Sequence, residues 1–325
     1  MRICVYGAGA IGGHLAGRLA KGGAEVSVAV RGPILAAIRA NGLRILAPDG
    51  ELHSHPHATD DAATIGPVDA VLVTAKAPAL ASVAAGISQL LGPDTPVLFV
   101  LSGIPWWYFD SHGGAHDGRR LPVLDPDETI RRAIGPARTL GGVVYSACEV
   151  REPGVVEVEN PNSRLVIGEP NGQLSARLEA IAAPLRAGGL NVQIADRIRD
   201  AIWSKLLGNI CSGPLAVITR SAPRDFRAEH NTETMLTLHN ETLAGAQALG
   251  CTPQVDLTRL RDMTRAMTHR PSILQDLLRG RPMEIDGIYA TPVELARMAG
   301  IATPMLDLMV AVVKVRAREA GLYNG

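Results

Sequence analysis

Short apolar runs alternate with helical patterns over the first part of the chain. The strand candidates are rich in β-branched residues and are residues 2–6, 25–30, 69–74 and 96–101. The helix candidates lie between them and repeat their apolar positions every three or four residues: residues 11–21, 33–41 and 79–91. Strands that alternate with helices predict a parallel, doubly wound sheet.

The pattern loosens after residue 103. Residues 143–170 have the alternation of antiparallel strands around a turn at Pro153-Gly154. A helix over residues 174–186 and a short strand over residues 191–194 complete this part of the chain.

From residue 196 onward nearly every segment has a helical pattern. The sequence Thr291-Pro292-Val293-Glu294 has the form of a capping box, which predicts that a helix begins there. The expected helix breaks are Pro214, Gly250, Pro271, residues 280–282 and residues 300–304. We predict an α/β domain over residues 1–195, followed by an all-α domain over residues 196–325.

Composition and charge narrow the class of partner. The 325 residues include 32 Lys and Arg against 32 Asp and Glu, so there is no global field to attract nucleic acid or an anionic membrane. We expect a small molecule as the partner. The four cysteines form no CxxC pair, which is typical of a reducing compartment and argues against a disulfide framework or a zinc site.

The N-terminus enters a strand at once, without the charged and apolar regions of a signal peptide. The apolar run around Val71 is interrupted by Lys76 and is too short to span a bilayer. We therefore expect a cytoplasmic protein.

A glycine-rich turn, Gly7-Ala8-Gly9-Ala10-Ile11-Gly12, follows the first predicted strand and opens the first predicted helix. Gly7 permits the tight turn, Gly9 lets backbone N–H groups approach a pyrophosphate, and Gly12 lets the helix pack closely on the strand. This context favours dinucleotide binding over an ordinary turn and makes the first domain a Rossmann-type domain.

The end of the second strand bears on the choice of dinucleotide. An NAD site would carry Asp or Glu there for the ribose 2′-hydroxyl, but the strand ends in Val30-Arg31. The guanidinium of Arg31 suits a 2′-phosphate, which predicts NADPH as the cofactor. A solvated surface arginine is the alternative reading.

A lysine lies in the middle of the apolar helical segment of residues 202–213, IWSKLLGNICSG. Lys205 and Asn209 are neighbours on one face of this helix, and small residues flank them. Two interpretations stay open from periodicity alone: a lysine whose stem covers apolar surface while its ammonium reaches water, and a cation that faces a bound molecule.

Four motifs together resemble the ketopantoate reductase family, the NADPH-dependent 2-dehydropantoate 2-reductases. They are GAGAIGG at the N-terminus, TAKAP at residues 74–78, the IWSKLLGN helix and the distal SILQDLLRGRPMEID. They occur in the family's order over nearly the whole chain. The resemblance implies a Rossmann domain and a helical domain with substrate and nicotinamide between them, in an enzyme of pantothenate biosynthesis.

The resemblance also implies roles for single residues. Lys205 would be the general acid that protonates the keto oxygen as hydride arrives, and Glu284 would lie near it. Asn209 and Ser272 would bind the substrate, a small 2-oxo acid. Lys76 would lie beside the cofactor.

The chain departs from the family pattern at several of these places. Ser102-Gly103 stands where the family has Asn-Gly near the nicotinamide and substrate, so both residues become candidate cofactor ligands and Ser102 a candidate substrate ligand. Gly213 replaces an expected asparagine, and the IDGIYA ending places Gly287 and Ala290 where the family has larger or polar residues. Fewer amide ligands are expected to weaken recognition of a hydroxylated acid such as ketopantoate.

Two further features have structural alternatives. Trp106 and Trp107 would either wall a pocket or interface or pack in the local core. His53, His55 and His57 alternate, but Pro56 interrupts them, so an exposed hairpin edge is favoured over a metal site.

Two other functions were weighed against the keto acid reductase. A β-hydroxyacid dehydrogenase also combines a Rossmann domain with helices and uses a helix lysine and asparagine. A redox sensor that binds NADPH without turnover is compatible with Ser102 and Gly213. The sequence leaves the substrate's identity undetermined and a homodimer open.

Overall fold

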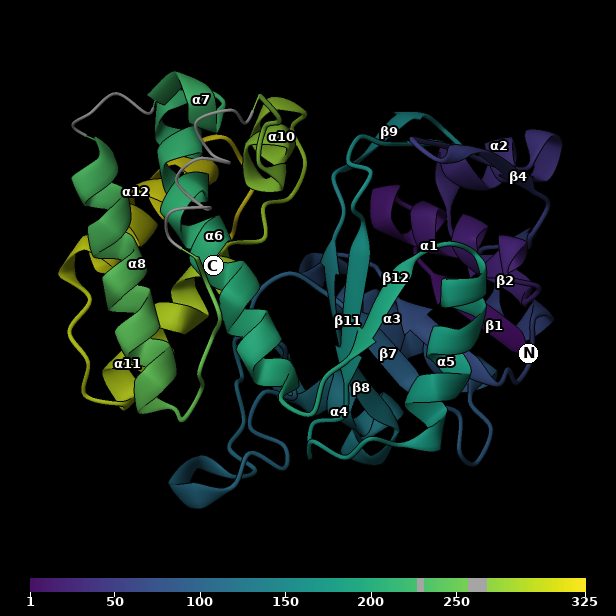
Figure 1. The fold of residues 1–325 in the computed structure, drawn as a ribbon, viewed down its shortest axis with the longest axis horizontal. Helices are drawn as coiled ribbons and strands as arrows, with labels where there is room; N and C mark the ends of the chain where they lie inside the picture. Colours follow the sequence, from purple (N-terminus) through teal and green to yellow (C-terminus); the bar gives the residue numbers. More distant parts are fainter. Residues whose placement is uncertain (227–230, 257–267) are drawn as a thin grey trace. The chain divides into compact units, whose positions relative to one another are not determined.

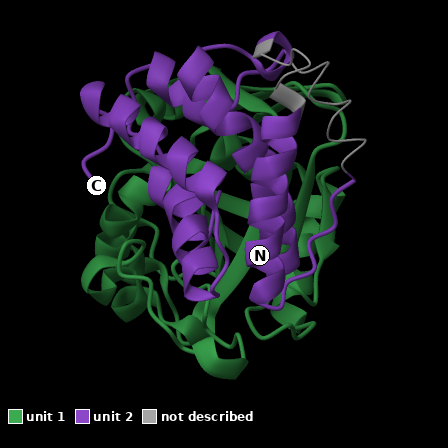
Figure 2. Cartoon of the chain, turned by 90° about the vertical axis from the view of Figure 1, so that its left-hand side faces the viewer, with its two compact units in different colours: residues 1–101, 106–198 green, residues 102–105, 199–325 purple. Residues whose placement is uncertain are grey.

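The computed structural model describes residues 1–226, 231–256 and 268–325, and these form two compact units (Figure 2). Unit 1 consists of residues 1–101 and 106–198, and unit 2 of residues 102–105 and 199–325. The chain therefore enters unit 2 for four residues after the first hundred and then returns to unit 1. The pattern of apolar residues gave no sign of this excursion.

An eight-stranded sheet forms the centre of unit 1, in the order β12-β11-β8-β7-β6-β1-β2-β5 (Figure 1). All its neighbours are parallel except β8 and β11, which pair antiparallel. The strands are β1 (Arg2–Tyr6), β2 (Glu25–Ala29), β5 (His57–Thr59), β6 (Ala70–Val73), β7 (Val97–Val100), β8 (Thr139–Tyr145), β11 (Arg164–Gly168) and β12 (Asn191–Ile194). The inner strands β6 and β7 are buried along their whole length, as expected of parallel strands covered on both faces.

Four of the helices of unit 1 lie where the sequence predicts them, and a short helix at Thr129–Ile134 was not predicted. The helices are α1 (Ala10–Lys21), α2 (Gly32–Asn41), α3 (Leu80–Ile87), α4 (Thr129–Ile134) and α5 (Ala176–Ala187). The single helix expected over residues 79–91 is instead α3 between two 3₁₀ turns, η2 (Ala77–Ala79) and η3 (Ser88–Leu90). Helices α1 and α5 pack against each other and share one hydrophobic core with the sheet (Figure 1).

A second, four-stranded sheet covers α1 in unit 1, in the order β4-β3-β10-β9. It joins two hairpins that are far apart in the sequence: β3 (Leu43–Ala47) with β4 (Gly50–Ser54), and β9 (Cys148–Glu152) with β10 (Val155–Val158). Strands β3 and β10 pair in parallel. The turn at Pro153-Gly154 was predicted, but β3 and its pairing were not, because the pairing is a tertiary contact. His53 lies exposed on the edge strand β4, which confirms the predicted hairpin edge.

The described residues of unit 2 form helices: α6 (Ile198–Thr219), α7 (Pro223–Phe226), α8 (Asn231–Ala248), α10 (Ser272–Leu278), the π-helical turn η7 (Asp286–Ala290), α11 (Thr291–Met298) and α12 (Pro304–Glu319). Helix α8 packs against α11 and α12 (Figure 1). A Rossmann-type domain followed by a helical domain, the predicted fold class, is confirmed.

One expected helix break in unit 2 is wrong, and one predicted cap is not formed although its helix, α11, begins at Thr291 as predicted. Helix α6 continues through Pro214 to Thr219, because the residues on both sides of the proline are buried and their packing offsets the one lost backbone hydrogen bond. Thr291 does not cap α11, because Ala290 already has helical dihedral angles and the helix runs on from η7. Thr291 is instead completely buried.

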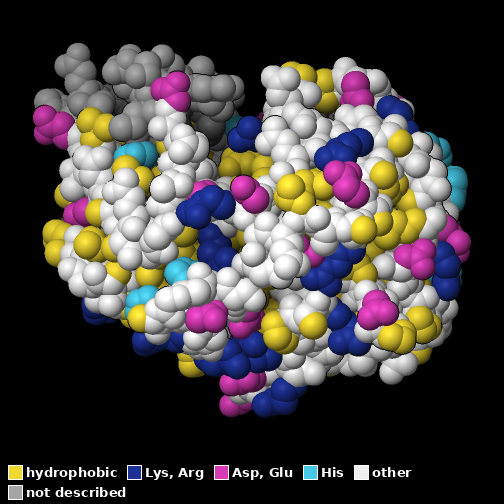
Figure 3. All heavy atoms as spheres, turned by 60° about the horizontal axis from the view of Figure 1, so that its bottom comes forward, with side chains coloured by type: hydrophobic (Ala, Val, Ile, Leu, Met, Phe, Trp, Pro, Cys, Tyr) yellow, Lys and Arg dark blue, Asp and Glu magenta, His cyan; other side chains and the backbone are white. Residues whose placement is uncertain are grey.

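The charged side chains on the surface are mixed, and one helix of unit 2 is strongly apolar. On the face in Figure 3, basic and acidic side chains lie interspersed. Among the described residues, α6 is the one helix long and apolar enough to cross a bilayer, and 67% of its apolar window is buried. Core helices of soluble proteins meet the same criteria, so this helix is weak support for a membrane span.

Candidate active site

The glycine turn of unit 1 has the backbone that its sequence predicts. Gly7 follows β1 with φ of +101°, a conformation that side chains rarely adopt, and Gly9 is the residue before α1. A Cβ at Gly12 would lie 1.8 Å from the carbonyl oxygen of Gly7 and 2.4 Å from Thr74 Oγ1. The hydroxyl of Thr74 donates a hydrogen bond to that same carbonyl. Gly12 therefore lets α1 pack against the end of β1, as predicted.

The N-terminus of α1 is open to a ligand. Gly9 is exposed, and a Cβ built on it would meet no atom within 4 Å. The first turn of α1 contains no acidic side chain, so its N–H groups and the positive end of the helix dipole have no acidic residue of that turn beside them. This cradle fits the pyrophosphate of a dinucleotide.

Arg31 and Lys76 lie at the same edge of the sheet as the glycine turn. Strands β6, β1 and β2 are parallel neighbours, and Lys76, Gly7 and Arg31 follow their carboxyl ends. Arg31 is exposed at the start of α2, and Lys76 is exposed at the start of η2. Ligands of open α/β sheets bind at this edge, which carries these two cationic side chains.

In unit 2 the middle of α6 brings Lys205 next to Ser102. The Lys205 ammonium donates to Ser102 Oγ across 3.5 Å, which is a weak hydrogen bond. Burial lowers the pKa of Lys205 to about 8, and the negative charge of Glu284 opposes that change. Lys205 is thus a half-buried cation on which the charge of a carboxylate acts.

Ser102 reaches this place because the segment 102–105 docks on the turn η7. The backbone N–H of Ile104 donates to the Gly287 carbonyl at 2.7 Å. Gly103 has φ of +90°, and a Cβ on it would lie 2.4 Å from the carbonyl carbon and oxygen of Gly287. The absence of a side chain at Gly103 therefore permits this close approach to the backbone of Gly287.

The C-terminal residues hold the segment that carries Glu284. The N–H of Met283 donates to the Leu322 carbonyl at 3.0 Å, and the hydroxyl of Tyr323 donates to Asp286. Glu284 lies between these two anchors, half-buried, and its charge acts on Lys205. The sequence did not predict these contacts, because the C-terminal residues 322–325 contain no motif that indicates where they pack.

The two other predicted substrate ligands, Asn209 and Ser272, differ in burial. Asn209 is half-buried one turn beyond Lys205 on α6. Ser272 is the exposed first residue of α10, and within the described part of the chain no hydrogen bond joins it to Lys205, Ser102 or Glu284. Lys205 and Ser102 are thus in contact in unit 2, the charge of Glu284 acts on Lys205, and Asn209 follows one turn further along α6.

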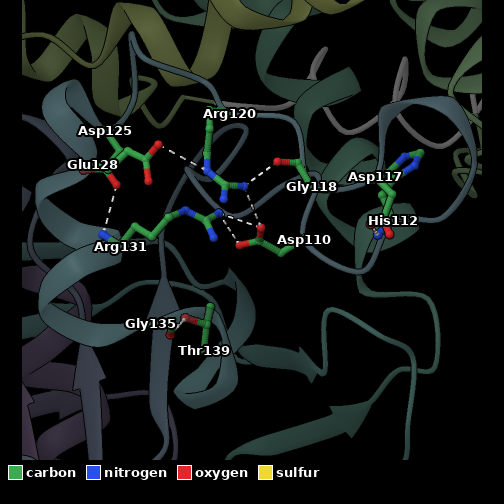
Figure 4. A network of polar contacts seen from close by, with 10 residues as sticks. All are labelled: Asp110, His112, Asp117, Gly118, Arg120, Asp125, Glu128, Arg131, Gly135 and Thr139. Atoms are coloured by element: carbon green, nitrogen blue, oxygen red, sulfur yellow. Dashed lines mark hydrogen bonds and ion pairs between the residues drawn. The ribbon is translucent and has the colours of Figure 1, made fainter.

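Trp106 and Trp107 pack in the core of unit 1. They are 3% and 1% exposed, and Trp106 lies edge-on to Phe99 with the Arg131 guanidinium over its ring. Arg131 also forms an ion pair with the buried Asp110, within the polar network of Figure 4. The structure thus agrees with the core-packing interpretation of the two tryptophans.

Comparison with known proteins places the chain in a family. The ketopantoate reductase PanE/ApbA family matches residues 3–172, and its C-terminal family matches residues 197–317. A 2-dehydropantoate 2-reductase of Mesorhizobium japonicum is 39% identical over the whole length of both chains. The chain belongs to the ketopantoate reductase family.

Solved structures agree with this assignment. One from Ralstonia solanacearum MolK2, assigned as a ketopantoate reductase, is 37% identical with a TM-score of 0.90, and 99% of each chain is covered. The 2-dehydropantoate 2-reductase of Geobacter metallireducens GS-15 is 26% identical with a TM-score of 0.84, over 97% of this chain and 99% of that one. The protein is therefore an oxidoreductase of a pyridine-nucleotide-dependent family, for which a keto acid is the fitting substrate.

Proposed function

We propose that the protein reduces the keto group of a 2-oxo acid, 2-dehydropantoate or a close relative, with NADPH as the hydride donor and Lys205 as the general acid. The observation that supports the proposal is the position of the half-buried Lys205 ammonium. It contacts Ser102, and the negative charge of Glu284 favours its protonated form. The family assignment and the name of the 39% identical relative support the reaction type.

The cofactor proposal rests on the fit of the α1 cradle and on charge. The open space at Gly9 and the first turn of α1 would hold the pyrophosphate, together with Ala8, Ala10 and Ile11 of the same turn. Arg31, at the end of β2, would bind the 2′-phosphate that distinguishes NADPH from NADH. Lys76 would contribute a second cation at this edge.

The chemistry assigned to unit 2 follows from the charge that develops on the substrate. When bound, the reduced nicotinamide supplies a hydride to the keto carbon. The keto oxygen then gains negative charge, which the Lys205 ammonium stabilises and neutralises by giving up a proton. A pKa of about 8 suits this role, since the group is mostly protonated at neutral pH and is a stronger acid than an ordinary lysine.

The neighbours of Lys205 would keep the substrate and the ammonium in place. Ser102 would hydrogen-bond the substrate near its reacting carbon, and Asn209 and Ser272 would bind its other polar groups. Glu284 favours the charged form of Lys205 and so keeps the proton available.

The direct test is oxidation of NADPH in the presence of a panel of 2-oxo acids that includes 2-dehydropantoate, with NADH as the matched cofactor. We expect turnover with at least one acid and a higher kcat/KM with NADPH than with NADH. Tight NADPH binding with no turnover of any acid would refute the reductase and indicate a protein that only binds the dinucleotide.

A further inference from the structure

The space beside Gly213 on α6 is filled by the side chain of Tyr289. A Cβ built at Gly213 would lie 1.9 Å from the Tyr289 hydroxyl oxygen and 3.0 Å from its Cζ. Tyr289 comes from the π-helical turn η7, close in sequence to Glu284. The phenol therefore takes the place of the side chain that Gly213 lacks.

The Tyr289 hydroxyl lies at the end of a buried side chain. Tyr289 as a whole is 1% exposed, and no hydrogen bond of its hydroxyl is found within residues 1–226, 231–256 and 268–325. The polar end of a buried tyrosine usually has a hydrogen-bond partner. A molecule bound along α6 would supply one.

The charge of Glu284 acts on both this hydroxyl and Lys205. Burial and the negative charge of Glu284 both raise the pKa of Tyr289 well above its usual value. The phenol is therefore neutral at physiological pH and can donate a hydrogen bond. Since the charge of Glu284 also acts on Lys205, both groups lie within electrostatic reach of one carboxylate.

The spacing along α6 places Lys205 and Gly213 on one face of the helix. Lys205, Asn209 and Gly213 follow one another at intervals of about one turn. A molecule bound along this face would therefore contact Lys205, Asn209 and the Tyr289 hydroxyl beside Gly213.

We propose that the Tyr289 hydroxyl binds a hydroxyl group at the end of the substrate side chain remote from the carboxylate, and that Gly213 is required to leave room for it. This inference rests on the proposed reduction of a 2-oxo acid. It reverses the expectation from sequence that the loss of an amide at Gly213 weakens recognition of a hydroxylated acid. The phenol supplies the polar group instead.

The test compares two substrates that differ in one hydroxyl: 2-dehydropantoate and 3,3-dimethyl-2-oxobutanoate, which has the same carbon skeleton without it. We expect the protein to prefer the hydroxylated acid in kcat/KM and Tyr289→Phe to reduce that preference about tenfold. The kcat/KM for the acid without the hydroxyl should change less than twofold. Tyr145→Phe, a tyrosine of unit 1, is the matched control and should leave the preference unchanged.

The outcomes separate this inference from the proposed function. If Tyr289→Phe leaves the preference as it was in an active enzyme, the role of Tyr289 is refuted and the reductase stands. If the unmodified protein turns over no 2-oxo acid, the proposed function fails and this inference fails with it.

A pair of variants tests the geometry without any substrate. Gly213→Ala should lower Tm because its Cβ collides with the Tyr289 hydroxyl oxygen. In combination with Tyr289→Phe the nearest contact becomes the ring carbon at 3.0 Å, so most of that loss should be recovered. An equal loss of Tm with and without the hydroxyl would show that the phenol does not occupy this space.

Discussion

The glycine turn of unit 1 and the Lys205 site of unit 2 are built in opposite ways. The turn consists of consecutive residues whose missing side chains expose the backbone, and α1 has no acid in its first turn. The Lys205 site consists of charged and polar side chains from segments that are far apart in sequence, with Ser102, Lys205 and Glu284 at its centre. A site made of local backbone can be recognised from sequence, whereas a site made of distant side chains depends on the tertiary fold.

The largest effect should come from filling the glycine turn. Gly12→Val would place a Cβ 1.8 Å from the Gly7 carbonyl oxygen, which α1 and β1 can avoid only by moving apart. We expect loss of dinucleotide binding and a loss of stability of about 3 kcal/mol or more. Calorimetry and thermal unfolding measure the two effects.

Gly9→Ala is the matched variant within the same turn. Its Cβ meets no protein atom within 4 Å, so the variant should fold with unchanged Tm. If a pyrophosphate approaches this backbone, its dinucleotide Kd should rise about tenfold. Normal binding by Gly9→Ala would contradict the backbone cradle.

A substitution of Lys205 should instead lower the rate of the chemical step and leave dinucleotide binding intact. Lys205→Ala should lower kcat about 100- to 10,000-fold, because the proton donor is gone, and leave the Kd for NADPH unchanged. Lys205→Arg keeps the positive charge but holds its proton too tightly, so it should lose most of the activity as well. Full activity in Lys205→Ala, measured as NADPH oxidation, would remove Lys205 from the mechanism.

A substitution of Arg31 tests whether unit 1 binds the dinucleotide with a side chain as well as with backbone groups. Arg31→Ala should raise the Kd for NADPH about tenfold or more, because it removes charge-assisted hydrogen bonds to the 2′-phosphate. The Kd for NADH should change less than twofold. Arg44→Ala removes a half-buried, ion-paired arginine on another strand of unit 1 and serves as the control. Equal losses for both dinucleotides in Arg31→Ala would show that no 2′-phosphate is bound there.

The smallest effect concerns the pH dependence of reduction. Because the pKa of Lys205 is about 8, kcat should be constant below that pH and fall about tenfold per unit above it. Glu284 raises this pKa, so Glu284→Gln should move the fall to lower pH by about one unit or less. A pH profile of Glu284→Gln with an unmoved midpoint would show that this carboxylate does not act on the proton donor.

The same contrast explains how much could be predicted from sequence. Most of the alternating strands and helices of unit 1 and the glycine turn follow local patterns and were predicted to within one or two residues, whereas α4 and β5 were missed. Strand β3 was missed because its partner β10 lies more than a hundred residues away. Pro214 was misread as a break because burial outweighs the local cost of a proline.

The candidate site of unit 2 was only partly visible in sequence. Lys205 and Asn209 share a helix face by spacing, but the roles of Ser102 and Glu284 came from the family resemblance. Tyr289 was missed because it reaches Gly213 only through the π-helical turn η7, which no periodicity predicts. The glycines that looked like losses are places where another part of unit 2 makes a close approach.

The central claim is that the Lys205 ammonium protonates the substrate's keto oxygen. A crystal structure with NADP⁺ and a non-reacting analogue of the 2-oxo acid tests it most directly, through the distance from Lys205 Nζ to that oxygen. The account predicts a hydrogen bond of about 2.8 Å. A separation beyond about 5 Å, with another donor within hydrogen-bond reach of the oxygen, would contradict it.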